Sequence, residues 1–343
     1  MERNLITGPD FCAVTEDGIL TEFLKSDPSM QYGDILIGTV ERMMPGIGSA
    51  FVDIGRKKSG FLPIRENSLS FQGEKLRSGM KTAVQIRKEE TGGKGAFLTR
   101  DLTLAGKNVL LMPMNRYIGV SSRITDEEDR ERLRRIGQDV SQNRTGLVMR
   151  TAALNAGMEE IAEETHRLMS EWETVSARIK EGCGSGTVLY HQDPVTQMIR
   201  DYEAKGVNRQ IMADAPDADL QRQLRAAGER TVRTGNGGNI VIDRCEAMTV
   251  IDVNSGSAKA DGRPESAYLE TNLSACETIA AQIRLRDLSG IILIDFIDLK
   301  QSEDRDKVEQ TLADALKRDR RKTVLHGWTH LGIMEMTRKR TGQ

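Results

Sequence analysis

The sequence predicts an α+β protein of several domains, and three observations carry this prediction. The chain has 343 residues, of which 38% are hydrophobic, so it can bury more than one core. Residues 33–100 contain short apolar segments separated by glycine-rich turns, a pattern typical of a small closed β-barrel. The last hundred residues instead alternate strand and helix patterns.

Strand patterns dominate the first hundred residues. Three short strands are expected before residue 30, at Asn4–Thr7, Cys12–Thr15 and Ile19–Leu24, because turn residues separate these apolar segments. The barrel strands are expected at 35–40, 49–55, 59–64 and 82–90.

The middle of the chain mixes strands with helices. Strands are expected at 109–113 and 146–152, and the clearest helix spans 158–180. The apolar residues that share one face of this helix are Ile161, Leu168, Met169, Trp172, Val175 and Ile179. A strand at 187–192 and a helix containing Met198 and Tyr202 follow.

The last hundred residues predict a hairpin, a helix, a strand and a closing helix. The hairpin covers 240–255, after a glycine run at 235–238, and the second strand covers 290–299. An amphipathic helix between them is marked by Leu269, Leu273, Cys276, Ala280 and Ile283. The closing helix is marked by Val308, Leu312 and Leu316.

The balance of charge excludes one class of protein. With 49 basic and 51 acidic side chains, the formal charge of −2 excludes a chain that binds nucleic acid through bulk positive charge. Local patches remain possible, because residues 33–105 hold twelve Lys or Arg against eight Asp or Glu. Residues 317–340 hold eight against two. We therefore expect two basic patches.

Cysteine usage and hydropathy indicate a cytoplasmic protein. The four cysteines lie far apart and form no CxxC pair, so neither a zinc knuckle nor a disulfide framework is expected. No apolar run approaches the ~18 residues of a membrane span. The first nine residues lack the apolar core of a signal peptide.

Carboxylates stand at the ends of two apolar strands. Asp252 follows the apolar residues 248–251 and precedes Asn254, while Asp295 follows 291–294 and precedes Asp298. Two strands joined by one helix are expected to be neighbours in a sheet, so both carboxylates could face one crevice. Such oxygen ligands suit Mg²⁺. The alternative is that each aspartate caps the turn or helix after it.

These residues carry a resemblance to a known family. Residues 251–255 (IDVNS) and 269–299, which contain RLRDLSG and IDFID, resemble the catalytic core of the ribonuclease E/G family, and 331–340 continue the match. The resemblance implies an endoribonuclease that cleaves single-stranded RNA in RNA processing and decay, leaving 5′-phosphate and 3′-hydroxyl ends. Mg²⁺, with Mn²⁺ as an alternative, would be the metal. Asp252 and Asp295 would bind it as the catalytic pair, with Asn254 assisting and Asp298 in support.

The barrel segment carries a second resemblance. Residues 33–64 resemble an S1 RNA-binding domain, an OB-fold barrel. Phe51 and Phe61 flank the basic turn 56–58, and base stacking on aromatic rings beside cations is a common way to bind single strands. By resemblance, both rings and Lys94 match the family's RNA-contacting positions. The alternative is that Phe51 and Phe61 are core residues of the barrel.

A third segment resembles the part of the family that reads the 5′-monophosphate of the RNA. In residues 146–152, Arg150 would form a forked contact with the phosphate and Thr151 would donate its hydroxyl. Arg123 would border this pocket. A preference for 5′-monophosphorylated RNA is then expected. The alternative is an arginine–carboxylate surface pair, since acidic residues crowd 126–131.

The resemblance also gives domain boundaries. It implies an S1 barrel (33–105) inserted in an RNase H-like subdomain (1–32 and a reduced 182–239), then a 5′-sensor-like region (106–181) and a DNase I-like α/β catalytic subdomain (240–343). The CPxC zinc-link and the small domain of larger members are missing from this sequence, so no structural zinc is expected and the oligomeric state stays open. His326 and His330 are expected to serve packing. The rival function is a non-catalytic S1-type RNA-binding protein, against which the intact acidic pair argues.

Overall fold

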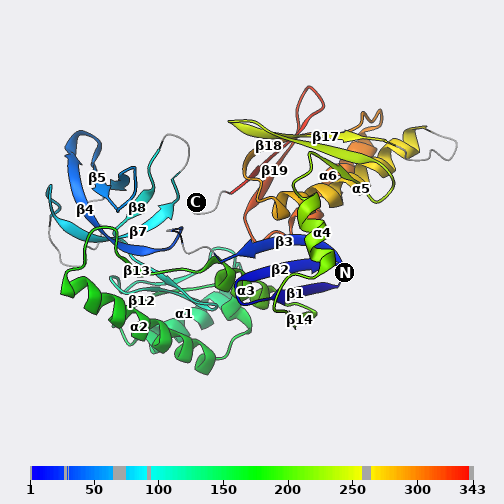
Figure 1. The fold of residues 1–343 in the computed structure, drawn as a ribbon. Helices are drawn as coiled ribbons and strands as arrows, with labels where there is room; N and C mark the ends of the chain where they lie inside the picture. Colours follow the sequence, from blue (N-terminus) through cyan, green and yellow to red (C-terminus); the bar gives the residue numbers. More distant parts are fainter. Residues whose placement is uncertain are drawn as a thin grey trace. The chain divides into compact units, whose positions relative to one another are not determined.

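The computed structural model describes residues 2–26, 29, 31–64, 75–90, 94–256 and 264–339. The chain forms two compact units: unit 1 contains residues 1–25 and 207–340, and unit 2 contains residues 26–206. Both units mix strands and helices, so the predicted α+β class is confirmed (Figure 1). Unit 1 is thus discontinuous in sequence, with unit 2 between its two segments.

A closed five-stranded barrel begins unit 2. Its strands are β4 (Ile35–Met44), β5 (Ser49–Asp53), β6 (Gly60–Pro63), β7 (Lys81–Lys88) and β8 (Phe97–Thr99). They pair in the order β4-β5-β6-β8-β7, and β7 pairs back with β4 to close the barrel. Inward-facing residues such as Val52, Leu62 and Ile86 fill its core. This topology is consistent with an OB-fold.

The remainder of unit 2 is a small sheet packed against two helices. The strand order is β11-β12-β10-β9. The bounds are β9 (Leu104–Ala105), β10 (Val109–Met112), β11 (Ile118–Val120), β12 (Gly146–Met149), α1 (Glu127–Ser141) and α2 (Met158–Glu181). The predicted helix 158–180 is confirmed as α2, and its Ile161, Leu168 and Val175 are buried in this core.

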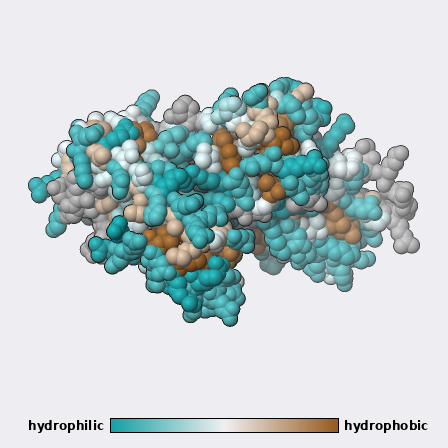
Figure 2. All heavy atoms as spheres, turned by 90° about the horizontal axis from the view of Figure 1, so that it is seen from below, coloured by the Kyte–Doolittle hydropathy of each residue, from teal (hydrophilic) through white to brown (hydrophobic). Residues whose placement is uncertain are grey.

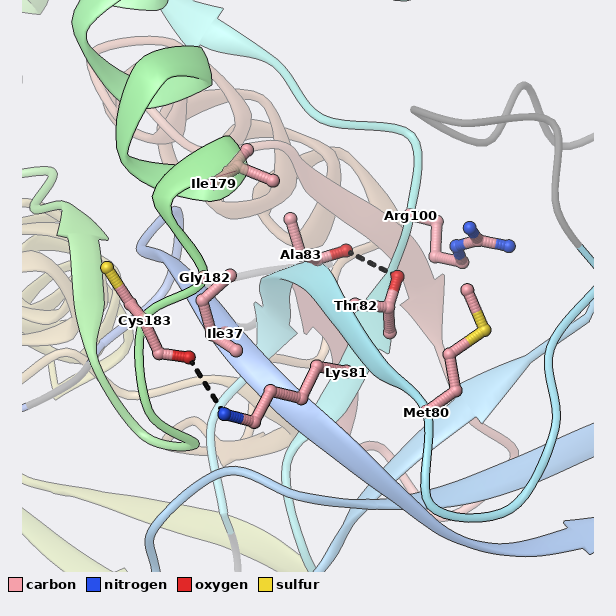
Figure 3. A pocket seen from close by; sticks show the side chains of 9 residues that line it. All are labelled: Ile37, Met80, Lys81, Thr82, Ala83, Arg100, Ile179, Gly182 and Cys183. Carbon is pink, nitrogen blue, oxygen red and sulfur yellow. Dashed lines mark hydrogen bonds between the residues drawn. The ribbon is translucent and has the colours of Figure 1, made fainter.

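Short elements complete unit 2 and connect its two parts. They are two 3₁₀ turns, η1 (Pro45–Ile47) and η2 (Thr151–Asn155), then β13 (Val188–Tyr190) and α3 (Pro194–Lys205). Strand β13 adds to the barrel beside β4. Figure 3 shows a small cavity of about 70 Å³ where barrel residues Ile37 and Lys81 meet Ile179 and Cys183 at the end of α2. The Lys81 Nζ donates to the Cys183 carbonyl oxygen over 3.3 Å.

The first sheet of unit 1 contains strands from both of its sequence segments. Its order is β14-β1-β2-β3, with β1 (Arg3–Thr7), β2 (Phe11–Glu16), β3 (Ile19–Lys25) and β14 (Arg209–Met212). The three predicted N-terminal strands are confirmed as an antiparallel meander. Strand β14 pairs with β1 in parallel across two hundred residues of sequence. Helix α4 (Ala218–Ala226) contacts β3.

The second sheet of unit 1 has the strand order β15-β16-β17-β18-β20-β19. The bounds are β15 (Thr231–Arg233), β16 (Asn239–Arg244), β17 (Met248–Asn254), β18 (Gly290–Asp295), β19 (Thr323–Trp328), β20 (Met334–Arg338), α5 (Pro264–Leu285) and α6 (Ser302–Leu316). Helices α5 and α6 pack against one face (Figure 1). The predicted hairpin is β16–β17, and both predicted helices are confirmed. Strands β19 and β20 were not predicted.

Ion pairs of Glu16 connect the two sheets of unit 1, and we call Glu16 with Arg284 and Arg3 the joint. The guanidinium of Arg284 on α5 donates to both carboxylate oxygens of Glu16 on β2, over 2.9 and 2.7 Å, and both side chains are buried. Burial raises the pKa of Glu16, but the hydrogen bond and charge of Arg284 outweigh it and lower that pKa to about 2. Arg3 adds two more donors, its Nε at 3.1 Å and its Nη2 at 2.9 Å from the Glu16 Oε1. The charge on Glu16 is therefore fully compensated.

The basic segment 317–340 supplies several more of these internal pairs. Arg318 pairs with Glu16 and Glu277, Arg320 with Glu22, and Arg321 with Asp287. Arg338 pairs with Asp319 at 2.6 Å, and both side chains are only 1% exposed. The expectation that 317–340 forms a basic patch is therefore wrong for these four arginines, because each of them pairs with a carboxylate of unit 1.

One face of the molecule is mainly hydrophilic (Figure 2). Figure 2 shows one face, on which polar and charged residues cover most of the area and hydrophobic residues form small separate patches. Among the residues that the structure describes, no helix has the length and apolar character needed to span a membrane.

Candidate functional site

The two predicted catalytic carboxylates are direct neighbours in the second sheet of unit 1. Strands β17 and β18 are parallel, and Asp252 lies opposite Asp295 at the end of their pairing. Neighbouring strands lie about 4.8 Å apart, so the two side chains share one place on the sheet. Ile251, Val253 and Ile294 are buried beneath α5 and α6. Since side chains alternate along a strand, both aspartates point to the opposite face, where they are exposed.

Asn254 joins this pair. Its side-chain amide donates from Nδ2 to the Asp252 Oδ2 over 2.7 Å, which orients the carboxylate. The glycine run explains how the neighbouring loop fits here. A Cβ atom on Gly238 would lie 2.9 Å from the Asn254 carbonyl oxygen, so a side chain at that position would push against the end of β17.

The electrostatics of the pair are those of crowded like charges. Although Asp295 is exposed, neighbouring atoms shield its carboxyl in part from water, which raises its pKa, and the charges of Asp252 and Asp298 raise it further. Asp298 is exposed on the loop after β18, yet it is near enough to affect Asp295. A cation would relieve this repulsion.

The donor set fits a hard divalent cation. Mg²⁺ is usually bound through one or two carboxylates and keeps several waters. In the described ranges, no three His, Cys, Asp or Glu side chains gather as a ready metal cage. Asp252 and Asp295 together offer two carboxylates, the number that Mg²⁺ usually takes from a protein. Capping does not account for them, because neither carboxylate accepts a backbone N–H hydrogen bond from any residue described.

Asn272 is a positioning residue that the sequence analysis missed. It lies fully buried on α5, where its amide donates to the Ile297 carbonyl oxygen over 2.8 Å and accepts from the Ile297 N–H over 3.0 Å. These two bonds hold the loop that carries Asp298. The sequence feature that could have indicated Asn272 is its position, because it continues the buried face of α5 formed by Cys276 and Ile279.

The two late histidines do not pack in a core. His326 and His330 are both exposed, so the expectation of a packing role is wrong. The His326 Nε2 lies 3.0 Å from the Thr337 Oγ1 on the neighbouring strand.

Phe51 and Phe61 lie side by side on the outside of the barrel. They are opposite each other in the β5–β6 pairing, with ring centroids 6.0 Å apart and planes at 68°. Both are half-buried, whereas the alternating residues Ala50, Val52 and Leu62 form the core. The alternative that they are core residues is therefore wrong. Lys94 is exposed, on the segment between β7 and β8.

The three predicted phosphate-sensing residues lie just after two strands that end at the same edge of the small sheet of unit 2. Strands β11 and β12 are parallel and end together, with Val120 opposite Met149. Arg123 therefore follows one strand, while Arg150 and Thr151 follow the other. Arg123 and Thr151 are exposed.

Arg150 is engaged with two partners within unit 2. Its Nη2 donates to the Asp201 Oδ1 over 2.9 Å, and its Nη1 donates to the Gly106 carbonyl oxygen. An arginine–carboxylate pair therefore exists, but its acid belongs to α3 and not to residues 126–131. The side chain of Arg150 is 31% exposed, so one part of it still faces solvent.

Comparison with known proteins gives a family. The sequence model described as "Ribonuclease E/G family" matches residues 103–219 and 215–341. The chain belongs to the ribonuclease E/G family. It is 34% identical to the ribonuclease G of Haemophilus influenzae over 378 aligned positions, which cover 96% of this chain and 77% of that protein. The predicted enzyme class, an endoribonuclease of the E/G type, is confirmed.

Further relatives carry the same names. The chain is 34% identical to the ribonuclease G of Escherichia coli strain K12, over 90% of this chain and 73% of that protein. It is 32% identical to the ribonuclease E of a Nostoc species, over 96% of this chain and 54% of that protein.

Part of the segment that resembles the ribonuclease E/G core has a structural role. In RLRDL (284–288), Arg284 pairs with Glu16, and Asp287 accepts from Arg338 over 2.7 Å in a left-handed backbone conformation at φ 50°. Leu288 is buried. The resemblance therefore covers both the carboxylate site and the joint behind it.

Proposed function

We propose that this member of the ribonuclease E/G family cleaves single-stranded RNA internally at the Asp252–Asp295 pair. The observation that carries the proposal is the register of β17 and β18, which puts the two carboxylates opposite each other beside Asn254. The substrate class is supported by the family and by the outward-facing, half-buried rings and the exposed cations of the barrel. The four free cysteines support a location in the cytoplasm.

Asp252 and Asp295 would hold Mg²⁺, with Mn²⁺ as the alternative. When bound, such an ion supplies Lewis-acid chemistry, offsetting charge on the phosphoryl oxygens and making a water more acidic. Asn254 holds the Asp252 carboxylate in one orientation, so the ligand is set before RNA arrives. Asp298 adds negative charge that favours a cation at this position.

The reaction is a hydrolysis with simple atom balance. The oxygen of a water attacks the phosphorus, the P–O3′ bond breaks, and a proton goes to the departing O3′. The products are a 5′-phosphate and a 3′-hydroxyl. Phe51 and Phe61 would stack two bases, and Lys94 would bind the backbone, keeping the strand extended for the attack.

The test replaces each carboxylate by its amide. Asp252→Asn and Asp295→Asn keep the size of the side chain but remove the charge that binds the cation. We expect cleavage of a 5′-monophosphorylated, AU-rich strand to fall by at least about 1000-fold, while binding measured in EDTA stays as in the wild type. Asp243→Asn is the matched control, because Asp243 is a partly exposed carboxylate of β16 that pairs with Arg230. Mg²⁺-dependent cutting by either site variant at the wild-type rate would exclude this site.

We further propose that Arg123, Arg150 and Thr151 recognise the 5′-monophosphate. The support is their common sheet edge and the partial exposure of Arg150, which would exchange Asp201 for the phosphate. Arg150→Ala should reduce the preference for 5′-monophosphorylated over 5′-hydroxylated RNA, measured as a ratio of kcat/KM values. Arg135→Ala, an exposed arginine of α1, should leave the ratio unchanged. An unchanged ratio in Arg150→Ala would reject the sensing role.

A further inference from the structure

A row of five side chains crosses the outer surface of the barrel, one from each strand. The pairings are Arg42 with Phe51, Phe51 with Phe61, Phe61 with Phe97, and Phe97 with Lys88. We call the three central rings the aromatic row. It carries a cation at each end, and Phe97 is its third member.

Two strand irregularities bring the cations to the ends of this row. The pairing of β4 with β5 shifts between Val40 and Arg42, and that of β7 with β8 shifts between Ile86 and Lys88. Without these shifts, Glu41 would lie opposite Phe51. A bulge redirects the side chains that follow it. The β4 bulge therefore puts Arg42 in place of Glu41 beside Phe51, whereas the shift in β7 puts Lys88 in place of another cation, Arg87, beside Phe97.

The geometry of the rings suits the stacking of successive bases. The centroids of Phe61 and Phe97 lie 5.8 Å apart, close to the 6.0 Å between Phe51 and Phe61. The Lys88 Nζ lies 5.7 Å from the centre of the Phe97 ring. Phe97 is half-buried, and its strand neighbours Ala96 and Leu98 supply the barrel core instead.

A pocket of about 170 Å³ adjoins Phe97. Pro63 and Thr99, each two residues along its strand from Phe61 and Phe97, form part of its lining, with Arg87 and Asp101. The Arg87 Nη2 donates to the Asp101 carbonyl oxygen over 3.1 Å, and the Asp101 N–H donates to the Thr99 Oγ1 over 3.0 Å. These bonds fix the lining. The polar residues Arg87, Thr99, Arg100 and Asp101 line most of the pocket, and Pro63, Phe97 and Leu98 add an apolar part, a mixture that can receive the polar edge of a stacked base.

We propose that Phe97 is a third base-stacking ring, and that the pocket beside it receives the edge of the stacked base. The proposal rests on the proposed RNA-binding function of the barrel and extends it by one nucleotide. The ligand is one base of a single RNA strand whose two neighbouring bases lie on Phe51 and Phe61. Lys88 then contacts the phosphate that follows.

The experiment is an abasic scan of a short oligoribonucleotide, with binding to the full chain followed by fluorescence anisotropy in EDTA. In the wild type, removal of the base at any of three consecutive positions should weaken binding by about 5-fold or more. In Phe97→Leu, binding of the intact strand should weaken by a similar factor, and sensitivity at one of the three positions should disappear. Phe51→Leu should remove sensitivity at a different position.

Phe23→Leu is the matched control, because Phe23 is a half-buried ring of unit 1 and should leave the scan unchanged. If Phe51→Leu changes the scan and Phe97→Leu does not, the proposal that Phe97 stacks a third base is wrong, while the proposed function is unaffected. If neither variant changes RNA affinity, RNA binding by the barrel is itself wrong. A uniform loss at all positions in Phe97→Leu, together with a lower Tm, would assign Phe97 a purely structural role and overturn the proposal.

Discussion

The barrel and residues 317–340 both carry a surplus of basic residues, but the structure uses them differently. In the barrel, Arg42, Lys57 and Lys94 are exposed, and no ion pair between described residues involves them. In the other segment, the arginines at 318, 320, 321 and 338 all pair with carboxylates of unit 1. A count of charges along a sequence therefore measures how many cations exist and not how many remain for a ligand.

The largest expected effect tests whether the arginines of residues 317–340 stabilise unit 1 through their ion pairs. Arg338→Met keeps the apolar stem but removes the guanidinium that pairs with the buried Asp319 carboxylate. Breaking a buried pair costs about 3–5 kcal/mol of unfolding free energy. The measurement is urea unfolding followed through Trp328 of unit 1, in a Trp172→Phe background.

Lys317→Met is the matched control for Arg338→Met. Lys317 is an exposed member of the same basic segment, and among the residues that the structure describes its ion pair is with Asp314 on the surface. Its replacement should change stability by less than about 1 kcal/mol. A loss of similar size in both variants would contradict the division between internal and exposed cations.

The second effect is a pH dependence confined to unit 1. The folded-state pKa of Glu16 is lowered to about 2 from an ordinary value of 4.5. Its contribution is therefore fully present above pH 4.5 and is lost as the pH falls toward 2. The full contribution is about 3 kcal/mol, at 1.36 kcal/mol for each pH unit of difference.

The free energy of unfolding of unit 1 should then decrease between pH 5 and pH 3 by a part of that amount. The chain has two tryptophans, Trp172 in unit 2 and Trp328 in unit 1, so single-tryptophan variants follow each unit. Glu16→Gln should flatten the curve reported by Trp328 and leave that of Trp172 unchanged. An unaltered Trp328 curve would show that the joint does not depend on the charge of Glu16.

The smallest effect concerns an exposed cation of the barrel. Lys57→Ala should leave stability within about 0.5 kcal/mol of the wild type. If Lys57 contacts a phosphate, the slope of log affinity against log salt should fall by about 0.7, the value for one single-strand contact. The same replacement at Lys317 should leave the slope unchanged. Equal slopes for wild type and Lys57→Ala would remove Lys57 from the binding surface.

The sequence predicts best where local pattern and function coincide. The apolar runs that end at Asp252 and Asp295 define the strands and the carboxylates together, and one intervening helix is enough to make the strands neighbours. Alternation along β5 and β6 likewise separates the rings from the core. The barrel and α2 could therefore be predicted from short-range periodicity alone.

The remaining features depend on partners far away in the sequence. Arg150 meets Asp201 across 51 residues, and Arg284 meets Glu16 across 268. Neither pairing follows from the sequence around either residue. Strand β19 escaped prediction because His326 and Gly327 interrupt its apolar residues, and β20 because a buried arginine, Arg338, takes the core position after Met334 and Met336. Asn272 was missed because a buried amide inside a helical stripe resembles an ordinary polar substitution.

The split of unit 1 across the chain has a consequence for the order in which the protein is made. A ribosome that adds about 5–20 residues each second needs roughly ten seconds or more to pass from residue 25 to residue 207. Throughout that interval β1 has no partner on its β14 side, and Glu16 has no Arg284. Unit 2 is continuous in sequence, so all of it is synthesised before the missing pieces of unit 1 emerge. The half that carries the carboxylates is thus the last to be completed.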